Sequence, residues 1–413
     1  MSDSITADHS YLLRSAAELE LTEARRQKAE RTKSLGSPIQ LTGNAIDIQI
    51  RGNYAWIAES AHVAKKIDLE TGKTLQIYRG HHAPVTCLAF YDRSPNSGDE
   101  KLLITGSWDK TIKIWDTNTK GVISTTAAHD DFVKTLLVVP SVKLLVSSSS
   151  DKIVKFWDLT DVLEKPPQPA GSVSAHSRPV ECIAGIANAD GSVTLFTADT
   201  MGVLKVWKLE RQGGPRPRWR SILQDTLNHH RTRITEIIYD AGYIWTASSD
   251  ETVQVVPYPP GSSDQKPIPP LTHPLPVRAI LPLALSDLEE PYIVTGYGDV
   301  IRLYDVSTPS EPEVLGEIDA HWHDVTALRL WIHKSRTDDG RTRIEPWIIS
   351  TSLDGTIRRW RFSELHDSTP DNPAGQSKAT VIAPTPQPSG DAKDQVEITD
   401  EEERELAELM EED

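Results

Sequence analysis

Short apolar runs that alternate with polar residues recur along most of the chain. Between residues 85 and 127 the sequence reads VTCLAFY, KLLITGS, TIKIWD and GVISTTA, with polar turn residues between the runs. The runs VKTLLVV, KLLVSSS, IVKFWDL and GSVSA repeat this order between residues 133 and 175. Short alternating runs separated by turn residues are typical of strands. The pattern therefore predicts an all-β chain built from four-stranded units.

Polar markers recur at fixed positions within these units. TGSWDKTIKIWD holds Ser107, Asp109 and Trp115, and SSSDKIVKFWD and TSLDGTIRRW repeat the same spacing. A histidine lies four residues before a Val or Ile at the start of six units, at His81, His129, His176, His230, His273 and His321. These histidines are 43 to 54 residues apart. A period of this length indicates a repeat architecture.

The aligned copies resemble the WD40 repeat family from about Ser37 to Phe362. The resemblance implies a β-propeller of four-stranded blades, and the copies number seven. Blade one lacks the opening histidine, and blade seven stops after three strands. The resemblance implies that an N-terminal strand, with residues 37–43 as the candidate, completes blade seven and closes the ring. An open ring would leave two bare strand edges.

In the family, the opening histidine, a hydroxyl residue before the turn, the turn aspartate and the tryptophan form a hydrogen-bonded chain. The implied sets are His81, Ser107, Asp109 and Trp115 in blade two, His129, Ser149, Asp151 and Trp157 in blade three, and His321, Ser352, Asp354 and Trp360 in blade seven. Blades four to six depart from this pattern, because Met201, Val256 and Gly298 each replace a marker. The pattern does not predict the chain in those three blades.

No catalytic, cofactor-binding or metal-binding residues are expected, and no small-molecule substrate. A Ser–His–Asp group that recurs in several blades favours a structural role, because a hydrolase needs one nucleophile beside an oxyanion site. Two cysteines cannot supply a disulfide framework or a zinc site. Cys87 and Cys182 each follow an opening histidine by six residues, so we expect both to be buried and unpaired.

The resemblance implies a scaffold or adaptor that binds other proteins within a larger intracellular complex. In the family, partners contact the loops around each opening histidine and the residue before the turn aspartate. The residues at these positions are Trp108, Phe132, Arg178, Arg233, Trp322 and His323. Exposed aromatic and arginine side chains are frequent hot spots of binding. The basic segment 211–220, with Trp219, is a further candidate loop.

Two alternative functions remain open. One is an assembly chaperone for a basic client, such as a ribosomal protein or a histone. The other is a substrate adaptor of a ubiquitin ligase. Adaptors of one such type carry an arginine two residues after the Trp-Asp pair, and IWDTN and FWDLT lack it.

The segments on either side of the propeller differ from it in composition. Residues 11–33 contain no Gly or Pro and predict a helix within an N-terminal extension, residues 1–36. This helix would dock a partner or an RNA, stay solvated, or pack on the propeller rim. Residues 363–390 predict a disordered linker, because they are rich in Pro, Ser, Thr and Asp.

Residues 391–413 form an acidic tail with twelve acids and two bases, and they carry ten of the sixteen net negative charges. Thr399 and Glu402 make a capping box before Leu406, Leu409 and Met410. The tail is therefore either a linear motif for a basic partner or a solubilising segment. The net charge of −16 argues against a general affinity for nucleic acid.

We expect the protein to reside in the cytoplasm or the nucleus. No apolar run approaches the roughly 20 residues that cross a bilayer, and the first thirty residues lack the apolar core of a secretory signal. Two cysteines in 413 residues are typical of a reducing compartment.

Overall fold

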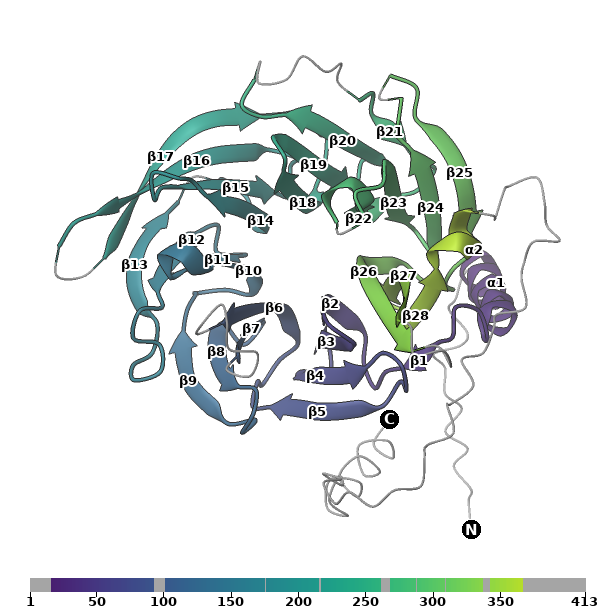
Figure 1. Cartoon of the computed structure of the whole chain (residues 1–413), viewed down its shortest axis with the longest axis horizontal. Helices are drawn as coiled ribbons and strands as arrows, with labels where there is room; N and C mark the ends of the chain where they lie inside the picture. The colour runs from purple at the N-terminus through teal and green to yellow at the C-terminus, as the bar shows by residue number, and fades with distance from the viewer. Residues whose placement is uncertain are drawn as a thin grey trace, which may run out of the picture. The chain divides into compact units, whose positions relative to one another are not determined.

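The computed structural model describes residues 16–92, 101–174, 176–214, 217–260, 268–286, 288–308, 310–336 and 342–366. Within these ranges, 28 strands form seven antiparallel four-stranded sheets, which surround a common centre as blades (Figure 1). The expectation of an all-β, seven-bladed propeller is confirmed. The acidic tail lies outside the described residues. No helix among the described residues is long and apolar enough to cross a membrane.

The first three blades follow one another along the chain. Blade one contains β2 (Ala45–Arg51), β3 (Tyr54–Glu59), β4 (Val63–Asp68) and β5 (Thr74–Arg79). Blade two contains β6 (Val85–Asp92), β7 (Lys101–Ser107), β8 (Thr111–Asp116) and β9 (Val122–Ala127). Blade three contains β10 (Val133–Val139), β11 (Leu144–Ser149), β12 (Val154–Asp158) and β13 (Gln168–Val173), with a short 3-10 turn η2 (Pro140–Val142).

Blades four to six repeat this order. Blade four contains β14 (Val180–Ala187), β15 (Val193–Asp199), β16 (Leu204–Gln212) and β17 (Arg218–Leu227). Blade five contains β18 (Ile234–Asp240), β19 (Tyr243–Ser248), β20 (Thr252–Pro257) and β21 (Leu271–Thr272). Blade six contains β22 (Val277–Pro282), the 3-10 turn η3 (Leu283–Leu285), β23 (Tyr292–Tyr297), β24 (Val300–Asp305) and β25 (Glu313–Ile318).

Blade seven joins the two ends of the propeller. It contains β26 (Val325–Arg336), β27 (Thr342–Ser352) and β28 (Thr356–Arg361), and its fourth strand is β1 (Ile39–Gln40). The first strand of each blade lies nearest the centre of the ring, and the fourth lies outermost (Figure 1). The repeated tryptophan of a blade fills the gap to the preceding blade. Trp157 of blade three packs with Leu102 and Ile114 of blade two, and Trp360 of blade seven packs with Ile301 of blade six.

The ring closes through a strand shorter than the predicted segment 37–43. Ile39 pairs with Ile357 and Gln40 with Thr356. The chain just before β1 is held by two further contacts. Arg358, with only 2% of its side chain exposed, donates hydrogen bonds to the carbonyls of Thr32 and Leu35. Gly36 has φ +66° and lies against the ring of Trp360, where a Cβ atom would come within 2.7 Å. Only glycine fits that position without strain.

Blade one, which lacks the opening histidine, is fixed to the closing strand by a buried ion pair. Lys65 Nζ lies 3.1 Å from Glu59 Oε2 and donates to Thr42 Oγ1 at 2.6 Å. The Thr42 hydroxyl donates to Glu59 at 3.0 Å. Burial raises the pKa of Glu59, and Lys65 opposes that rise. Since Thr42 follows β1, this cluster ties the N-terminal closing segment to blade one.

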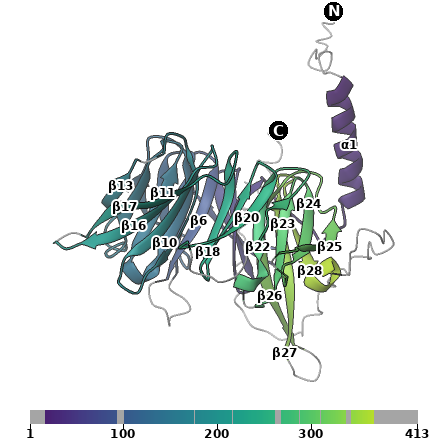
Figure 2. The same ribbon diagram turned by 90° about the horizontal axis from the view of Figure 1, so that it is seen from above.

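Three features extend beyond the regular blades. Helix α1 (Ala16–Thr32) rises from one face of the ring, and the β26–β27 hairpin projects from the opposite face (Figure 2). The start of the predicted helix, residues 11–15, lies outside the described residues. Helix α2 (Phe362–His366) continues the ordered chain beyond residue 362, because its buried Leu365 packs into the core between blades six and seven. The predicted linker therefore begins four residues too early.

Deleting residues 1–44 should destabilise the propeller far more than deleting residues 1–33. The longer deletion removes β1, Gly36 and Thr42 and so exposes the outer edge of β28. The shorter deletion keeps all three. We expect thermal unfolding to show a melting temperature lowered by about 3 °C or more, on the order of 2 kcal/mol or more, for the longer deletion alone. Equal melting temperatures for the two proteins would show that β1 does not close the ring.

Candidate functional site

A directed chain of hydrogen bonds runs through the interior of blade two. Asp109 Oδ2 lies 2.7 Å from His81 Nδ1, and His81 Nε2 lies 2.7 Å from Thr105 Oγ1. Trp115 Nε1 donates to the same threonine oxygen at 2.9 Å. An ionised carboxylate can only accept, so Nδ1 carries a proton and the neutral ring accepts the threonine hydroxyl at Nε2. Every polar atom in this chain thus has a partner of the right kind.

The hydroxyl in the middle of this chain is not the predicted one. Ser107 instead donates to the carbonyl of Ala83 at 2.9 Å and accepts the amide of Asp109 at 3.1 Å. The strand register explains the difference, because Trp115 pairs with Leu103 and lies diagonally beside Thr105. Ser107 lies at the turn end of the strand and braces the turn.

Blades three and seven share this correction. Ser147 and Ser350 occupy the middle position, each 2.8 Å from its histidine Nε2 and 2.9 Å from its tryptophan Nε1. The histidine–aspartate pairs are His129 with Asp151 and His321 with Asp354, both at 2.8 Å. The predicted Ser149 and Ser352 bond their turns as Ser107 does.

Blades four and five retain the histidine–aspartate pair despite their altered markers. Asp199, two residues earlier than expected, reaches His176 at 3.1 Å, and Thr197 links that histidine to Trp207. In blade five His230 lies 3.1 Å from Asp250 and 2.8 Å from Thr246. Val256 replaces the tryptophan, so the blade-five chain ends at the threonine.

Blade six lacks the histidine–aspartate pair. His273 Nε2 contacts Thr295 at 3.0 Å and the hydroxyl of Tyr304 at 3.2 Å. Asp299 follows Gly298 in the turn as Asp109 follows Trp108, but its carboxylate pairs with Lys28 of α1, and within the described ranges Nδ1 of His273 has no hydrogen-bond partner. Burial and, to a smaller extent, the nearby charge of Arg302 lower the pKa of His273 to about 4.

Burial and pairing act in opposite directions on the pKa values of the paired groups. Burial raises the pKa of Asp354, but the hydrogen bond and charge of His321 outweigh it, and the pKa falls to about 2. Burial lowers the pKa of His321, although Asp354 opposes this. A neutral histidine beside an ionised aspartate is therefore the stable state at pH 7.

Each middle hydroxyl is buried and already bonded, which supports a structural role for the chain. Within the described ranges, no group of three or more His, Cys, Asp or Glu side chains is placed to hold a metal ion.

The opening-histidine loops and the turns between second and third strands share one face of the ring, here termed the histidine face. In each blade the first residue of that turn donates its amide to the residue before the inner strand. Trp108 donates to Pro84 at 3.0 Å, and Ser150 donates to Phe132 at 3.0 Å. This repeated bond fixes the loops relative to one another. A rigid scaffold with exposed loops is well suited to binding.

The six predicted contact residues lie on this face in three groups. Trp108 and Phe132 stack across blades two and three with ring centroids 5.1 Å apart, and their exposed fractions are 41% and 39%. Arg178 and Arg233 lie over blades four and five, and both are exposed. Arg233 also forms a 2.6 Å ion pair with Glu181.

The third group, Trp322 and His323, is half-buried beside α1. These two residues line a cleft of about 230 Å³ together with Ala24, Arg25, Lys28, Asp299 and Asp324. The helix thus covers part of the predicted contact surface. Sequence reasoning missed Lys28, Asp299 and Asp319, which meet there although they lie far apart in the chain.

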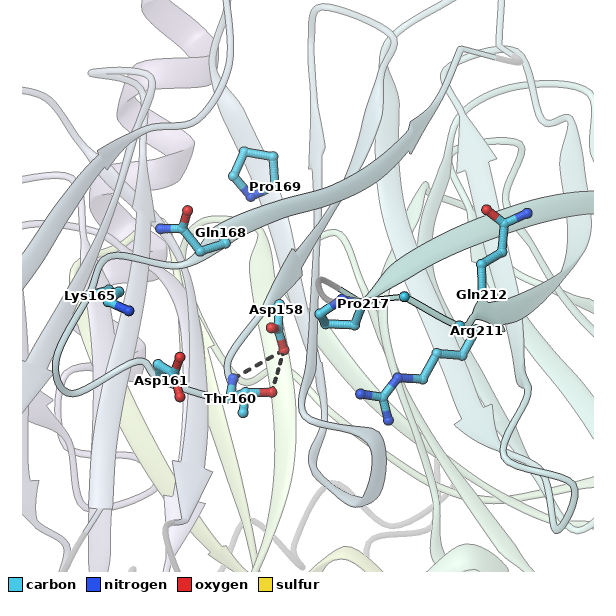
Figure 3. Close-up of a pocket in the computed structure, with 11 residues that line it drawn as sticks. Asp158, Thr160, Asp161, Lys165, Gln168, Pro169, Arg211, Gln212 and Pro217 are labelled. Carbon is cyan, nitrogen blue, oxygen red and sulfur yellow. Dashed lines mark hydrogen bonds between the residues drawn. The ribbon is translucent and has the colours of Figure 1, made fainter.

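A groove of about 800 Å³ lies on the outer side of blades three and four (Figure 3). Lys165 and Arg211 face it from opposite sides, and Asp158 between them accepts two hydrogen bonds from Thr160. The predicted contact residue Trp219 is not available at this edge, since only 6% of it is exposed. It packs instead in the core between the two blades, in one cluster with Phe156 and Ala170 of blade three.

The two cysteines agree with the expectation from sequence. Cys87 and Cys182 are both buried and free. Burial raises the pKa of both thiols far above the usual range. Neither side chain therefore presents a reactive thiolate near neutral pH.

Asp109→Ala should lower the free energy of unfolding by roughly 3–5 kcal/mol, because it leaves buried His81 without its acid. Asp299→Ala is the matched control. It removes the corresponding acid of blade six, which is partly exposed and bonds no blade histidine, so we expect a loss below about 1 kcal/mol. Chemical denaturation of both variants measures the difference. Equal losses would refute the bracing role of the pair.

His273 should make the fold sensitive to acid. The unfolded chain binds this proton near pH 6.5, whereas the folded chain binds it near pH 4, so acidification favours unfolding. The histidine should account for about 2 kcal/mol of the stability lost between pH 7 and pH 5. His273→Gln should reduce that loss by this amount. An unchanged pH dependence in His273→Gln would contradict the assignment.

Comparisons with known proteins agree with this architecture. The family model for the WD domain, G-beta repeat, matches residues 72–116 and 121–158. An uncharacterized WD repeat-containing protein of Schizosaccharomyces pombe is 26% identical over 383 residues, covering 89% of this chain and 94% of its own length. The crystal structure of a computationally designed protein, Ika8, superposes with a TM-score of 0.54 at 22% identity, over 77% of this chain and 83% of that one, and so shows the fold alone.

Shorter matches are found to proteins whose names state a role. The mRNA export factor GLE2 of Chaetomium thermophilum is 36% identical over 72 residues, 17% of this chain and 19% of that protein. The SAGA complex subunit Spt8 of Schizosaccharomyces pombe is 35% identical over 72 residues, 17% of this chain and 12% of that protein. Because the two matched repeats are continued by further blades of the same strand order around a closed ring, this chain belongs to the WD40 repeat family.

Proposed function

We propose that this protein is a non-enzymatic scaffold that holds other proteins on its histidine face. The observation that carries the proposal is the stacked pair of Trp108 and Phe132, which is exposed although both rings are large and apolar. Exposed aromatic side chains grouped on one surface are frequent anchors of protein–protein contacts. The polar chains beneath the loops support this role, because they hold the platform rigid without exposing their own reactive groups.

The aromatic pair is held in place before any partner arrives. The amide of Trp108 donates to Pro84, the carbonyl of Phe132 accepts from Ser150, and the amide of Phe132 donates to Asp131 at 2.8 Å. A rigid platform loses little conformational entropy on binding. A partner that covers both rings would gain roughly 2–3 kcal/mol from each.

The relatives support a role in a larger assembly of the cytoplasm or nucleus. Two of them are named as an mRNA export factor and as a subunit of the SAGA complex. We extend to this chain only the general role of binding other proteins within such an assembly. An adaptor for a ubiquitin ligase gains no support from blade seven, which reads WRF from Trp360 and has no Trp-Asp pair.

A chaperone for a basic client is the second candidate function. It is favoured by the contact between the helix and the propeller, in which Asp299 and Asp319 already hold the basic side chain of Lys28. The acidic tail was expected to serve the same purpose, and its twelve acids lie outside the described residues.

Trp108→Ala with Phe132→Ala should release proteins that co-purify with the full chain from native cells, by at least tenfold. Val122→Ala with Leu223→Ala is the matched control, since those side chains are 45% and 47% exposed but lie on outer strands. Quantitative mass spectrometry compares the three proteins, and thermal unfolding checks that all remain folded. Full retention of every partner by the aromatic double variant would refute this surface.

A further inference from the structure

The turn acid of blade six has moved out of the blade. Gly298 stands where blade two has Trp108, and it adopts φ +48°. Its amide donates to Pro276 at 3.1 Å, as the amide of Trp108 donates to Pro84. Asp299 therefore follows at the turn position of Asp109, but the turn to β24 is one residue shorter than that of blade two, and Nδ1 of His273 has no hydrogen-bond partner among the residues that the structure describes. The carboxylate of Asp299 lies 2.6 Å from the ammonium of Lys28 on α1.

A second carboxylate completes this site from the adjacent loop. Asp319 contacts Lys28 directly, and it forms a 2.6 Å ion pair with Arg31. The ammonium of Lys28 thus lies between two carboxylates, and its side chain is only 17% exposed. Opposite charges at this distance attract strongly once they are partly removed from water.

The backbone holds the two acidic loops together. The amide of His321 donates to the carbonyl of Asp299 at 3.0 Å, and the amide of Val325 donates to that of Gly298 at 2.7 Å. Both bonds join the turn of blade six to the opening loop of blade seven. The two carboxylates are therefore carried by loops that the propeller itself fixes, independently of the helix.

The helix is held much less firmly than the segment that follows it. Its ion pairs with the propeller are those of Lys28 and Arg31, and residues 22–27 are exposed. A helix without an apolar stripe gains little from burial, and ion pairs near the surface weaken as salt increases. By contrast, Arg358 and Trp360 fix residues 32–36 in the core of the seam.

We propose that Asp299 and Asp319 form a binding site for a basic helical segment of a partner protein, and that α1 occupies this site until the partner displaces it. Helix α1 shows which chemistry the partner segment needs, because its two cations, Lys28 and Arg31, lie three residues apart on one side of the helix. Trp322 and His323 border the site and provide flat rings against which such a helix lies. This site is separate from the aromatic pair of the proposed function and includes neither Trp108 nor Phe132.

Tethering makes α1 a strong competitor. A segment attached at residues 32–36 reaches its site at an effective concentration in the millimolar range. A free basic peptide should therefore bind weakly to the natural chain and tightly only when α1 is disabled. Charge reversal in the full chain, Lys28→Glu with Arg31→Glu, disables it without altering the two acids.

The first experiment measures binding of a fluorescent peptide with the sequence of residues 16–31 to the charge-reversed full chain by fluorescence anisotropy. Asp299→Asn with Asp319→Asn should weaken this binding at least tenfold. The matched control, Asp130→Asn with Asp131→Asn, neutralises two acids of the blade-three loop on the same face and should change it less than twofold. Equal affinity after both pairs of substitutions, or equal binding of a peptide with Glu at positions 28 and 31, would overturn the proposal.

The second experiment follows the seated helix in the natural full chain. Ala24→Cys places one thiol on α1 beside Trp322, and it alone should react with bimane, because Cys87 and Cys182 are buried with raised thiol pKa values. Trp322 should quench the bimane. An unrelated peptide of repeated Lys-Ala-Ala-Arg should relieve the quenching, as should Asp299→Asn with Asp319→Asn. Quenching that persists in both cases would overturn displacement of α1, whatever the result for Trp108 and Phe132.

Discussion

The hydrogen bond between a buried aspartate and a buried histidine holds the blades of this propeller in shape. Five blades contain this pair, at 2.7 to 3.1 Å. Removing a carboxylate from water is costly unless charge-assisted hydrogen bonds replace the lost solvent. Here those bonds come from the histidine ring, the turn amides and the turn hydroxyls. The pair consequently fixes the turn, the opening loop and, through the middle hydroxyl, the tryptophan between blades.

The two blades without the pair show how the same positions serve other purposes. In blade one, Glu59 and Lys65 replace it and hold the closing segment through Thr42. In blade six, Asp299 leaves the interior and holds the helix instead. Both exceptions lie next to blade seven, where the ends of the propeller meet. The two blades without the histidine–aspartate pair are therefore the ones that attach another segment of the chain to the ring.

The sequence predicted the architecture well because the repeat is local. Alternating runs define strands, and the spacing of His81, Asp109 and Trp115 lies within one blade. The middle hydroxyl was misplaced because only the strand register shows that Trp115 lies beside Thr105 and not Ser107. Trp219 was misjudged because it is buried by packing against blade three, whose Phe156 and Ala170 lie far from it in the sequence. The position of α1 could not be predicted, because its ion pairs join residues from opposite ends of the chain and α1 has no apolar stripe.

We infer that the neutral histidines of blades three, four, five and seven donate from Nδ1 to ionised aspartates, and ¹⁵N NMR of the imidazole nitrogens at pH 7 tests this pattern. We expect neutral rings protonated at Nδ1 for His129, His176, His230 and His321, because burial lowers the pKa of each. Neutral rings protonated at Nε2, or rings that titrate near pH 6.5 as free imidazole does, would contradict it.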